Sequence, residues 1–203
     1  MTRQELIEAI VKAEFEAFDK VKNEGGRASC QDDWGTFSIM RKSQYMTWPD
    51  KLLTLFYEYF TACMEDGRNL IAEKYGRMEE STAPEAYERI KEAFPVLSEN
   101  RIDLQEGIIA IQVNWMEEFA AKYPKMAGNA RSIHTSEDNA FNTSYETYLR
   151  GELSTYSEAL IYEYGRFIAQ LAGDRKNLAY ETMNNTAKLY GYESVEAAER
   201  KLQ

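Results

Sequence analysis

The chain has 203 residues and a formal net charge of −10. An acidic surface repels the phosphates of nucleic acids and anionic lipids, so general nucleic-acid binding and membrane-surface binding are not expected. The sequence holds only 11 glycines and 4 prolines, too few for a fold built on strands and tight turns.

Two cysteines, Cys30 and Cys63, are too few for a disulfide framework or a zinc site. No apolar run reaches membrane-spanning length, and the acidic, amphipathic N-terminal segment does not have the form of a signal or transit peptide. We therefore expect a soluble protein of the reducing cytoplasm. Cys63 falls on an apolar helical face, which predicts a core position.

Apolar residues at helical spacing predict a first helix over residues 2–22, ended by the segment NEGGRA at residues 23–28. A second long helix is expected from about residue 48 to about residue 75, with Gly67 weakening its middle. A short helix is expected over residues 83–94.

The next long helix is expected from residue 98 to just before Pro124, and the longest one over residues 144–171. Two shorter helices at residues 178–190 and 194–202 complete the chain. No segment has a convincing strand pattern. The sequence thus predicts an all-α fold: one domain over residues 1–203, a bundle of four long helices plus several short helices, with no sheet.

Four candidate helix starts share a Thr followed three residues later by an acid, the pattern of a capping box. They are Thr2 with Glu5, Thr47 with Asp50, Thr82 with Glu85, and Thr143 with Glu146.

Two polar segments between the expected helices combine several kinds of reactive side chain. The first polar segment (residues 30–45) carries Cys30, two aspartates and Trp34, and the second polar segment (residues 130–152) carries His134, the only histidine. Long polar connections with special composition often hold functional residues. We expect these two segments to form opposite walls of a polar cleft.

The stretches CQDDWGTFSIMRKSQYMTW and YLRGELSTYS give the chain a resemblance to an uncharacterised microbial family, domain-of-unknown-function family 4125. The likeness covers nearly the whole chain. The family brings no activity that can be transferred to any residue. Some members lie beside nucleotidyltransferase-like domains, so the resemblance implies a helical companion domain as an alternative function.

Three arginines lie within the two polar segments of an acidic chain, and guanidinium groups bind carboxylates or phosphates through two hydrogen bonds. We expect Arg41, Arg131 and Arg150 to hold an anion, with Trp34 and Tyr148 as flat apolar surface. The alternative is internal pairing of Arg131 and Arg150 with carboxylates such as Asp32, Asp138 or Glu146.

A catalytic Cys30 would need a base, and His134 is the only imidazole. The adjacent Asp32 and Asp33 argue against a thiolate, because negative charge raises a thiol pKa. If residues 34–45 form a short helix, one of these aspartates caps it. His134 is otherwise a candidate donor or proton-transfer group.

Glu14, Glu106 and Glu152 fall on apolar helical stripes, and acids that face a core must be paired, hydrogen-bonded or bound to metal. A di-iron bundle also needs two Glu-x-x-His motifs, which are absent from the sequence. Pairing with Arg41, Arg131 or Arg150, or with tyrosine hydroxyls, is the simpler explanation. An all-oxygen Mg or Mn site stays an alternative. The sequence assigns no metal ligand and identifies no particular cofactor.

The leading hypothesis is a cleft that binds a small anionic metabolite or a nucleotide. The alternatives are a helical interaction module that accompanies another enzyme, and a hydrolase or transferase that uses Cys30 with His134 or a carboxylate-bound metal. The residues expected to line the cleft are Asp32, Asp33, Trp34, Arg41, Arg131, Asp138, Tyr148, Arg150 and Glu152.

Overall fold

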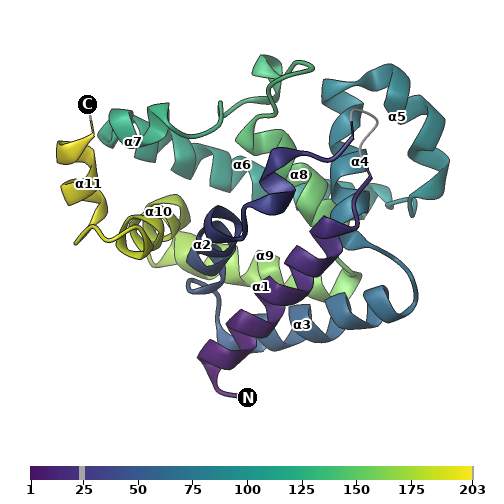
Figure 1. Cartoon of the computed structure of the whole chain (residues 1–203), viewed down its shortest axis with the longest axis horizontal. Helices are drawn as coiled ribbons and strands as arrows, with labels where there is room; N and C mark the ends of the chain where they lie inside the picture. The colour runs from purple at the N-terminus through teal and green to yellow at the C-terminus, as the bar shows by residue number, and fades with distance from the viewer. Residues whose placement is uncertain (23–25, 203) are drawn as a thin grey trace.

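The fold is all-α, as the sequence predicts. The computed structural model describes residues 1–22 and 26–202, so residues 23–25 of the NEGGRA segment lie outside it (Figure 1). The α-helices in this part of the chain are α1 (Arg3–Asp19), α2 (Trp34–Tyr45), α3 (Asp50–Glu65), α4 (Leu70–Thr82), α5 (Pro84–Ile90), α6 (Glu99–Lys122), α7 (Pro124–Gly128), α8 (Tyr145–Ser154), α9 (Glu158–Gly173), α10 (Leu178–Leu189) and α11 (Val195–Lys201). The 3₁₀ helices are η1 (Ser29–Asp32), η2 (Lys91–Ala93) and η3 (Thr135–Glu137). The described residues contain no strand, only one isolated bridge between Asn139 and Asn142.

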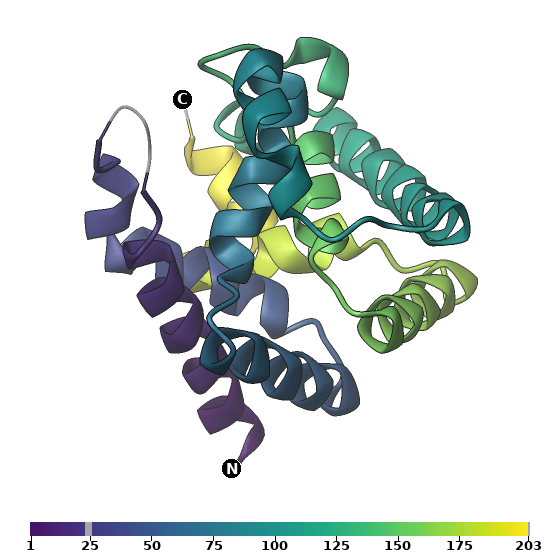
Figure 2. The ribbon, with the colours of Figure 1, turned by 90° about the vertical axis from the view of Figure 1, so that its right-hand side faces the viewer.

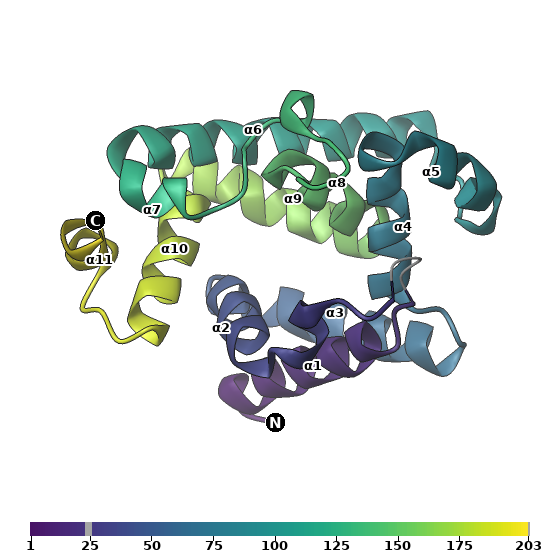
Figure 3. The ribbon, with the colours of Figure 1, turned by 45° about the horizontal axis from the view of Figure 1, so that its top comes forward.

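Helix α4 lies between α1 on one side and α8 on the other (Figure 2), and it also contacts α3 and α5. Figure 3 shows α6 and α9 side by side along one edge and α1, α2 and α3 along the opposite edge. Helix α10 contacts both α2 and α6. One hydrophobic core runs from Leu6 in α1 to Val195 in α11.

The centre of the core is aromatic. Trp48 is 1% exposed and contacts Tyr45, Phe56 and Tyr164 with ring centroids 4.9, 5.6 and 5.4 Å away. Full burial of a large apolar side chain stabilises a fold by about 1.5–3 kcal/mol. Cys63 is buried in the same core, as expected.

Two predicted long helices are each divided in the structure. The helix expected over residues 48–75 breaks at Gly67, which has a φ of +80°, and α4 restarts after its N-cap Asn69. The helix expected over residues 144–171 breaks after α8, and Ser157 caps α9. The longest helix is therefore α6, with 24 residues. The first helix also ends at Asp19 rather than residue 22.

Only one of the four predicted capping boxes forms. Thr2 and Glu5 make it at the start of α1, with Glu5 N and Thr2 Oγ1 3.3 Å apart. The other three predictions were wrong, because α3 and α5 begin without a side-chain cap and α8 is capped by Ser144, one residue beyond the predicted Thr.

Helices α4 and α8 approach unusually closely at Gly151. A Cβ at this position would lie 2.8 Å from Met78 Cγ and 2.9 Å from the Lys74 backbone oxygen. This contact sets Lys74 beside the next residue of α8, Glu152. Within the described residues, no helix combines the length and apolarity that crossing a membrane requires.

Candidate functional site

The two polar segments meet in the folded chain. Arg41 Nη1 in α2 lies 3.0 Å from Glu152 Oε2 in α8, and the Gln44 amide donates to Glu152 Oε1 at 3.1 Å. Residues 111 and 108 positions apart in the sequence are thus joined directly.

A buried charge network, made of Glu14, Arg41, Lys74 and Glu152, joins α1, α2, α4 and α8. Arg41 Nε and Nη2 donate to the two Glu14 oxygens at 2.8 and 2.5 Å. Lys74 Nζ donates to Glu152 Oε2 at 2.9 Å. None of the four is more than 7% exposed, and their two positive and two negative charges cancel.

Arg41 and Glu152 stay ionised because each has opposite charges beside it. Burial opposes the charged form of Glu152, but Arg41 and Lys74 hold the pKa of its carboxyl well below the ordinary value of 4.5. Burial likewise acts to lower the pKa of Arg41, and the carboxylates of Glu14 and Glu152 raise it well above its ordinary value. Arg41 directs all three guanidinium nitrogens to protein acceptors, so this network holds helices together.

Arg150 is also paired inside the protein. Its Nε and Nη2 donate to the two Glu106 oxygens at 2.8 Å each, and Nη2 also donates to Glu146 at 2.8 Å. Its Nη1 donates to Thr135 Oγ1 at 3.0 Å. Glu14, Glu106 and Glu152 are thus all paired with arginines. This is the simpler explanation that the sequence offered for acids on apolar helical stripes.

Tyr148 is flanked by cations. Lys74 Nζ lies 3.6 Å and Arg131 Cζ 4.6 Å from the centroid of its ring. Burial raises the pKa of Tyr148, but the positive charges of Lys74 and Arg41 outweigh it and hold the pKa below the ordinary value of 10.0.

Cys30 reaches the same region from the first polar segment. Burial raises the pKa of Tyr75, the neighbouring Tyr148 and Cys30 raise it further, and Arg131 lowers it. Cys30 of the first polar segment and Arg131 of the second therefore both influence the pKa of Tyr75.

His134 pairs with carboxylates of the second polar segment and of α6. Its Nε2 is 3.0 Å from a Glu117 oxygen in α6, and its Nδ1 is 4.0 Å from Glu146. The described hydrogen bonds do not include one between the exposed Cys30 thiol and this imidazole. The structure does not assemble the cysteine–histidine pair.

The aspartates of the candidate site bind the backbone and neighbouring side chains. Asp33 accepts from Thr36 N at 2.9 Å and caps α2, which spans the residues expected for a short helix. Asp32 pairs with Arg27 at 2.8 Å. Asp138 accepts from Ser81 Oγ at 2.6 Å and also from Thr147 and the Ser144 backbone.

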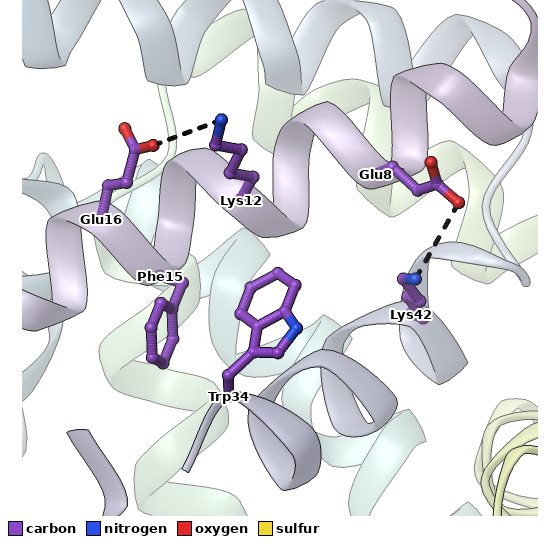
Figure 4. A pocket seen from close by; sticks show the side chains of 6 residues that line it. All are labelled: Glu8, Lys12, Phe15, Glu16, Trp34 and Lys42. Atoms are coloured by element: carbon purple, nitrogen blue, oxygen red, sulfur yellow. Dashed lines mark ion pairs between the residues drawn. The ribbon is translucent and has the colours of Figure 1, made fainter. Parts of the chain in front are cut away.

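Trp34 faces α1 rather than Arg131. Its ring contacts Phe15 edge to face, with centroids 5.0 Å apart. The two rings line a groove of about 570 Å³, the α1–α2 groove, which has four charged residues around them (Figure 4). These residues are Glu8, Lys12, Glu16 and Lys42.

A second hollow, the α6–α7 pocket, has a volume of about 250 Å³. Arg131, Ser132, His134 and Glu137 of the second polar segment line it together with Ala130 and Ile133. Met116, Ala120 and Ala127 contribute apolar surface from α6 and α7. Arg131 is the one guanidinium of the expected three that pairs with no carboxylate in the described part of the chain; its Nη1 donates to the Thr143 carbonyl at 3.3 Å.

The sequence predictions did not include Lys74 or the α6–α7 pocket. Lys74 is 3% exposed and falls at helical spacing between the buried Leu70 and Met78. A lysine on an apolar stripe requires a buried acid, and that signal could have linked it to Glu152. The pocket has no such signal, because it forms only when residues 130–134 fold back along α6.

Among residues 1–22 and 26–202, no three His, Cys, Asp or Glu side chains gather as metal ligands would. No curated protein and no solved structure matches the chain. A model of one family, described as protein of unknown function (DUF4125), matches residues 4–200. The chain therefore belongs to the DUF4125 family.

Proposed function

We propose that the protein binds a small anionic metabolite in the α6–α7 pocket, with Arg131 as the main anion-binding group. The observation that carries this proposal is the environment of Arg131. The guanidinium groups of Arg41 and Arg150 donate their hydrogen bonds to buried or half-buried carboxylates. Arg131 instead borders a pocket and stacks on the ring of Tyr148.

The size and the lining residues of the pocket limit the class of ligand that can bind there. The volume of about 250 Å³ lies just below the usual range of ligand sites, which starts at about 300 Å³, and this favours a small metabolite over a nucleotide. Apolar side chains from α6 and α7 suit a short carbon chain, and the Glu137 carboxylate at the rim disfavours multiply charged anions. The class that fits best is a short monocarboxylate whose carboxylate pairs with Arg131 and accepts from Ser132 or His134.

The interaction-module alternative needs a contiguous exposed apolar surface. The exposed large apolar side chains lie on α2, α6, α9, α10 and several connections, so no single helix among the described residues presents an apolar face to solvent. The environment of Arg131 is the more specific observation and favours the pocket.

The test is a thermal-shift screen of short monocarboxylates, dicarboxylates, inorganic phosphate and nucleotides, followed by calorimetry on the hits. A ligand that binds only the folded state stabilises it by about 2.7 kcal/mol at a concentration of 100 Kd. We expect Arg131→Gln to weaken binding of a monocarboxylate hit at least about tenfold, the loss of one charged hydrogen bond.

The matched control is Arg166→Gln, which removes the same charge from an α9 side chain that is 78% exposed. It should leave binding unchanged. If a hit binds Arg131→Gln as tightly as the unaltered protein, the assignment of the pocket is wrong. Selective binding of phosphate or nucleotides would contradict the ligand class.

A further inference from the structure

The α1–α2 groove differs from the α6–α7 pocket in place and in chemistry. Its sides come from α1 and from α2, and its volume of about 570 Å³ lies within the usual range for ligand sites. We propose that this groove is a second binding site, and that its ligand is a small aromatic zwitterion such as a free aromatic amino acid.

The aromatic half of the groove is preformed. Trp34 is 44% exposed, so part of its indole remains available while the rest packs on Phe15. Phe15 is fixed in turn by Phe37, with ring centroids 5.1 Å apart, and Phe37 stacks on the buried Phe18. A ligand ring entering beside Trp34 therefore meets two rings already held at 73° to each other, an arrangement that favours edge-to-face contacts.

The charged half of the groove has equal numbers of both signs. Glu8, Lys12 and Glu16 follow one another at four-residue spacing on α1, and Lys42 of α2 stands opposite Glu8 (Figure 4). Two ammonium groups and two carboxylates give the lining no net charge. Such a site attracts neither a simple anion nor a simple cation strongly, but it matches a ligand that carries one charge of each sign.

Both ion pairs in the groove are loose. Lys12 Nζ lies 3.9 Å from Glu16, and Lys42 Nζ lies 4.0 Å from Glu8, beyond hydrogen-bond distance in each case. Glu8 does accept a hydrogen bond from Gln4 at 3.2 Å. A ligand carboxylate can therefore receive a hydrogen bond from a lysine, and a ligand ammonium can donate to Glu16, without breaking a short internal pair.

The protein carries its own reporter for this site. Trp48 and Trp115 are 1% and 7% exposed, so acrylamide quenching of tryptophan fluorescence reports chiefly on Trp34. The experiment titrates the protein with L-phenylalanine, with phenethylamine, which lacks the carboxylate, and with 3-phenylpropionate, which lacks the ammonium. We expect L-phenylalanine to protect Trp34 from quenching, and the two analogues to bind at least about tenfold more weakly, since each loses one charged hydrogen bond.

Variants of the groove distinguish binding through specific charged contacts from non-specific hydrophobic binding. Lys12→Gln and Glu16→Gln should each weaken L-phenylalanine binding at least about tenfold, because these two side chains are neighbours and one amino acid carries its two charges on the same carbon atom. The control Lys188→Gln removes an exposed lysine of α10 and should bind as the unaltered protein does. Arg131→Gln should also bind L-phenylalanine normally, so the two proposed sites are tested independently.

Three results would overturn this assignment. They are protection by either analogue as strong as that by L-phenylalanine, unchanged binding to both groove variants, and no protection up to the solubility limit of the amino acid. Protection by a peptide but not by the free amino acid would assign the groove to a protein partner instead.

Discussion

At the scale of single residues, Glu152 is the most heavily bonded carboxylate of the site. It accepts from Arg41, Gln44, Lys74 and Tyr156, which come from α2, α4 and the turn after α8. A buried charge that loses its partner keeps the cost of desolvation and loses the attraction that offset it. Replacement of this one side chain should therefore have a large effect.

We expect Glu152→Gln to lower the free energy of unfolding by about 3–5 kcal/mol, because it leaves Lys74 and part of Arg41 buried without a counter-charge. Urea denaturation measures this change. Glu106→Gln is the matched control: it removes the same charge from a side chain that is 40% exposed, and should cost less than about 1 kcal/mol. Equal losses in both variants would contradict a special role for the network.

The same carboxylate predicts a pH dependence. Its folded-state pKa is lowered, so its contribution is complete above the ordinary glutamate pKa of 4.5 and falls as the pH drops below that value. The stability difference between the unaltered protein and Glu152→Gln should thus be constant near neutral pH and shrink below pH 4.5. A difference that grows on acidification would have the wrong sign.

At the scale of helices, the decisive feature is the contact of α4 with α8 at Gly151. We expect Gly151→Ala to lower the free energy of unfolding by about 1–3 kcal/mol, because its Cβ meets a backbone oxygen that has little freedom to move. Gly107→Ala in α6 is the control, since nothing lies within 4 Å of the added Cβ. It should stabilise the protein by up to about 1 kcal/mol through helix propensity, and urea denaturation of both variants checks the pair.

Helix positions were largely predictable from the sequence, and helix breaks were not. Periodic apolar residues located every long helix, and Gly67 was a visible weak point. The break between α8 and α9 was hidden, because Leu153, Tyr156 and Leu160 continue the apolar spacing through it. Ser157 can cap a new helix, but a serine within an apolar helical pattern does not by itself mark a break, so the sequence does not show that the chain turns there.

The candidate site was predictable only in part. Acids on apolar stripes required partners, and pairing with arginines followed from that requirement. Which arginine stays unpaired depends on the geometry of the folded chain, and so does the orientation of Trp34 toward Phe15. Neither property has a local sequence signal.

At the scale of the whole molecule, one core joins helices from both ends of the chain. The buried charge network adds a second connection between α1, α2, α4 and α8. We propose on these grounds that the chain is one cooperative domain.

Cooperative unfolding of one domain predicts a single thermal transition. The midpoints from far-UV circular dichroism and from tryptophan fluorescence should coincide, because Trp48 and Trp115 are buried in the same core. Two separated transitions would show that part of the chain unfolds independently.

The order in which the network's members leave the ribosome has a consequence for biosynthesis. Glu14, Arg41 and Lys74 emerge early, and Glu152 follows only after most of the chain has been translated. Until then Lys74 has no acid to neutralise it, and water must continue to solvate its ammonium group. The N-terminal helices should consequently stay loosely associated on the nascent chain and reach their final packing only once α8 has been synthesised.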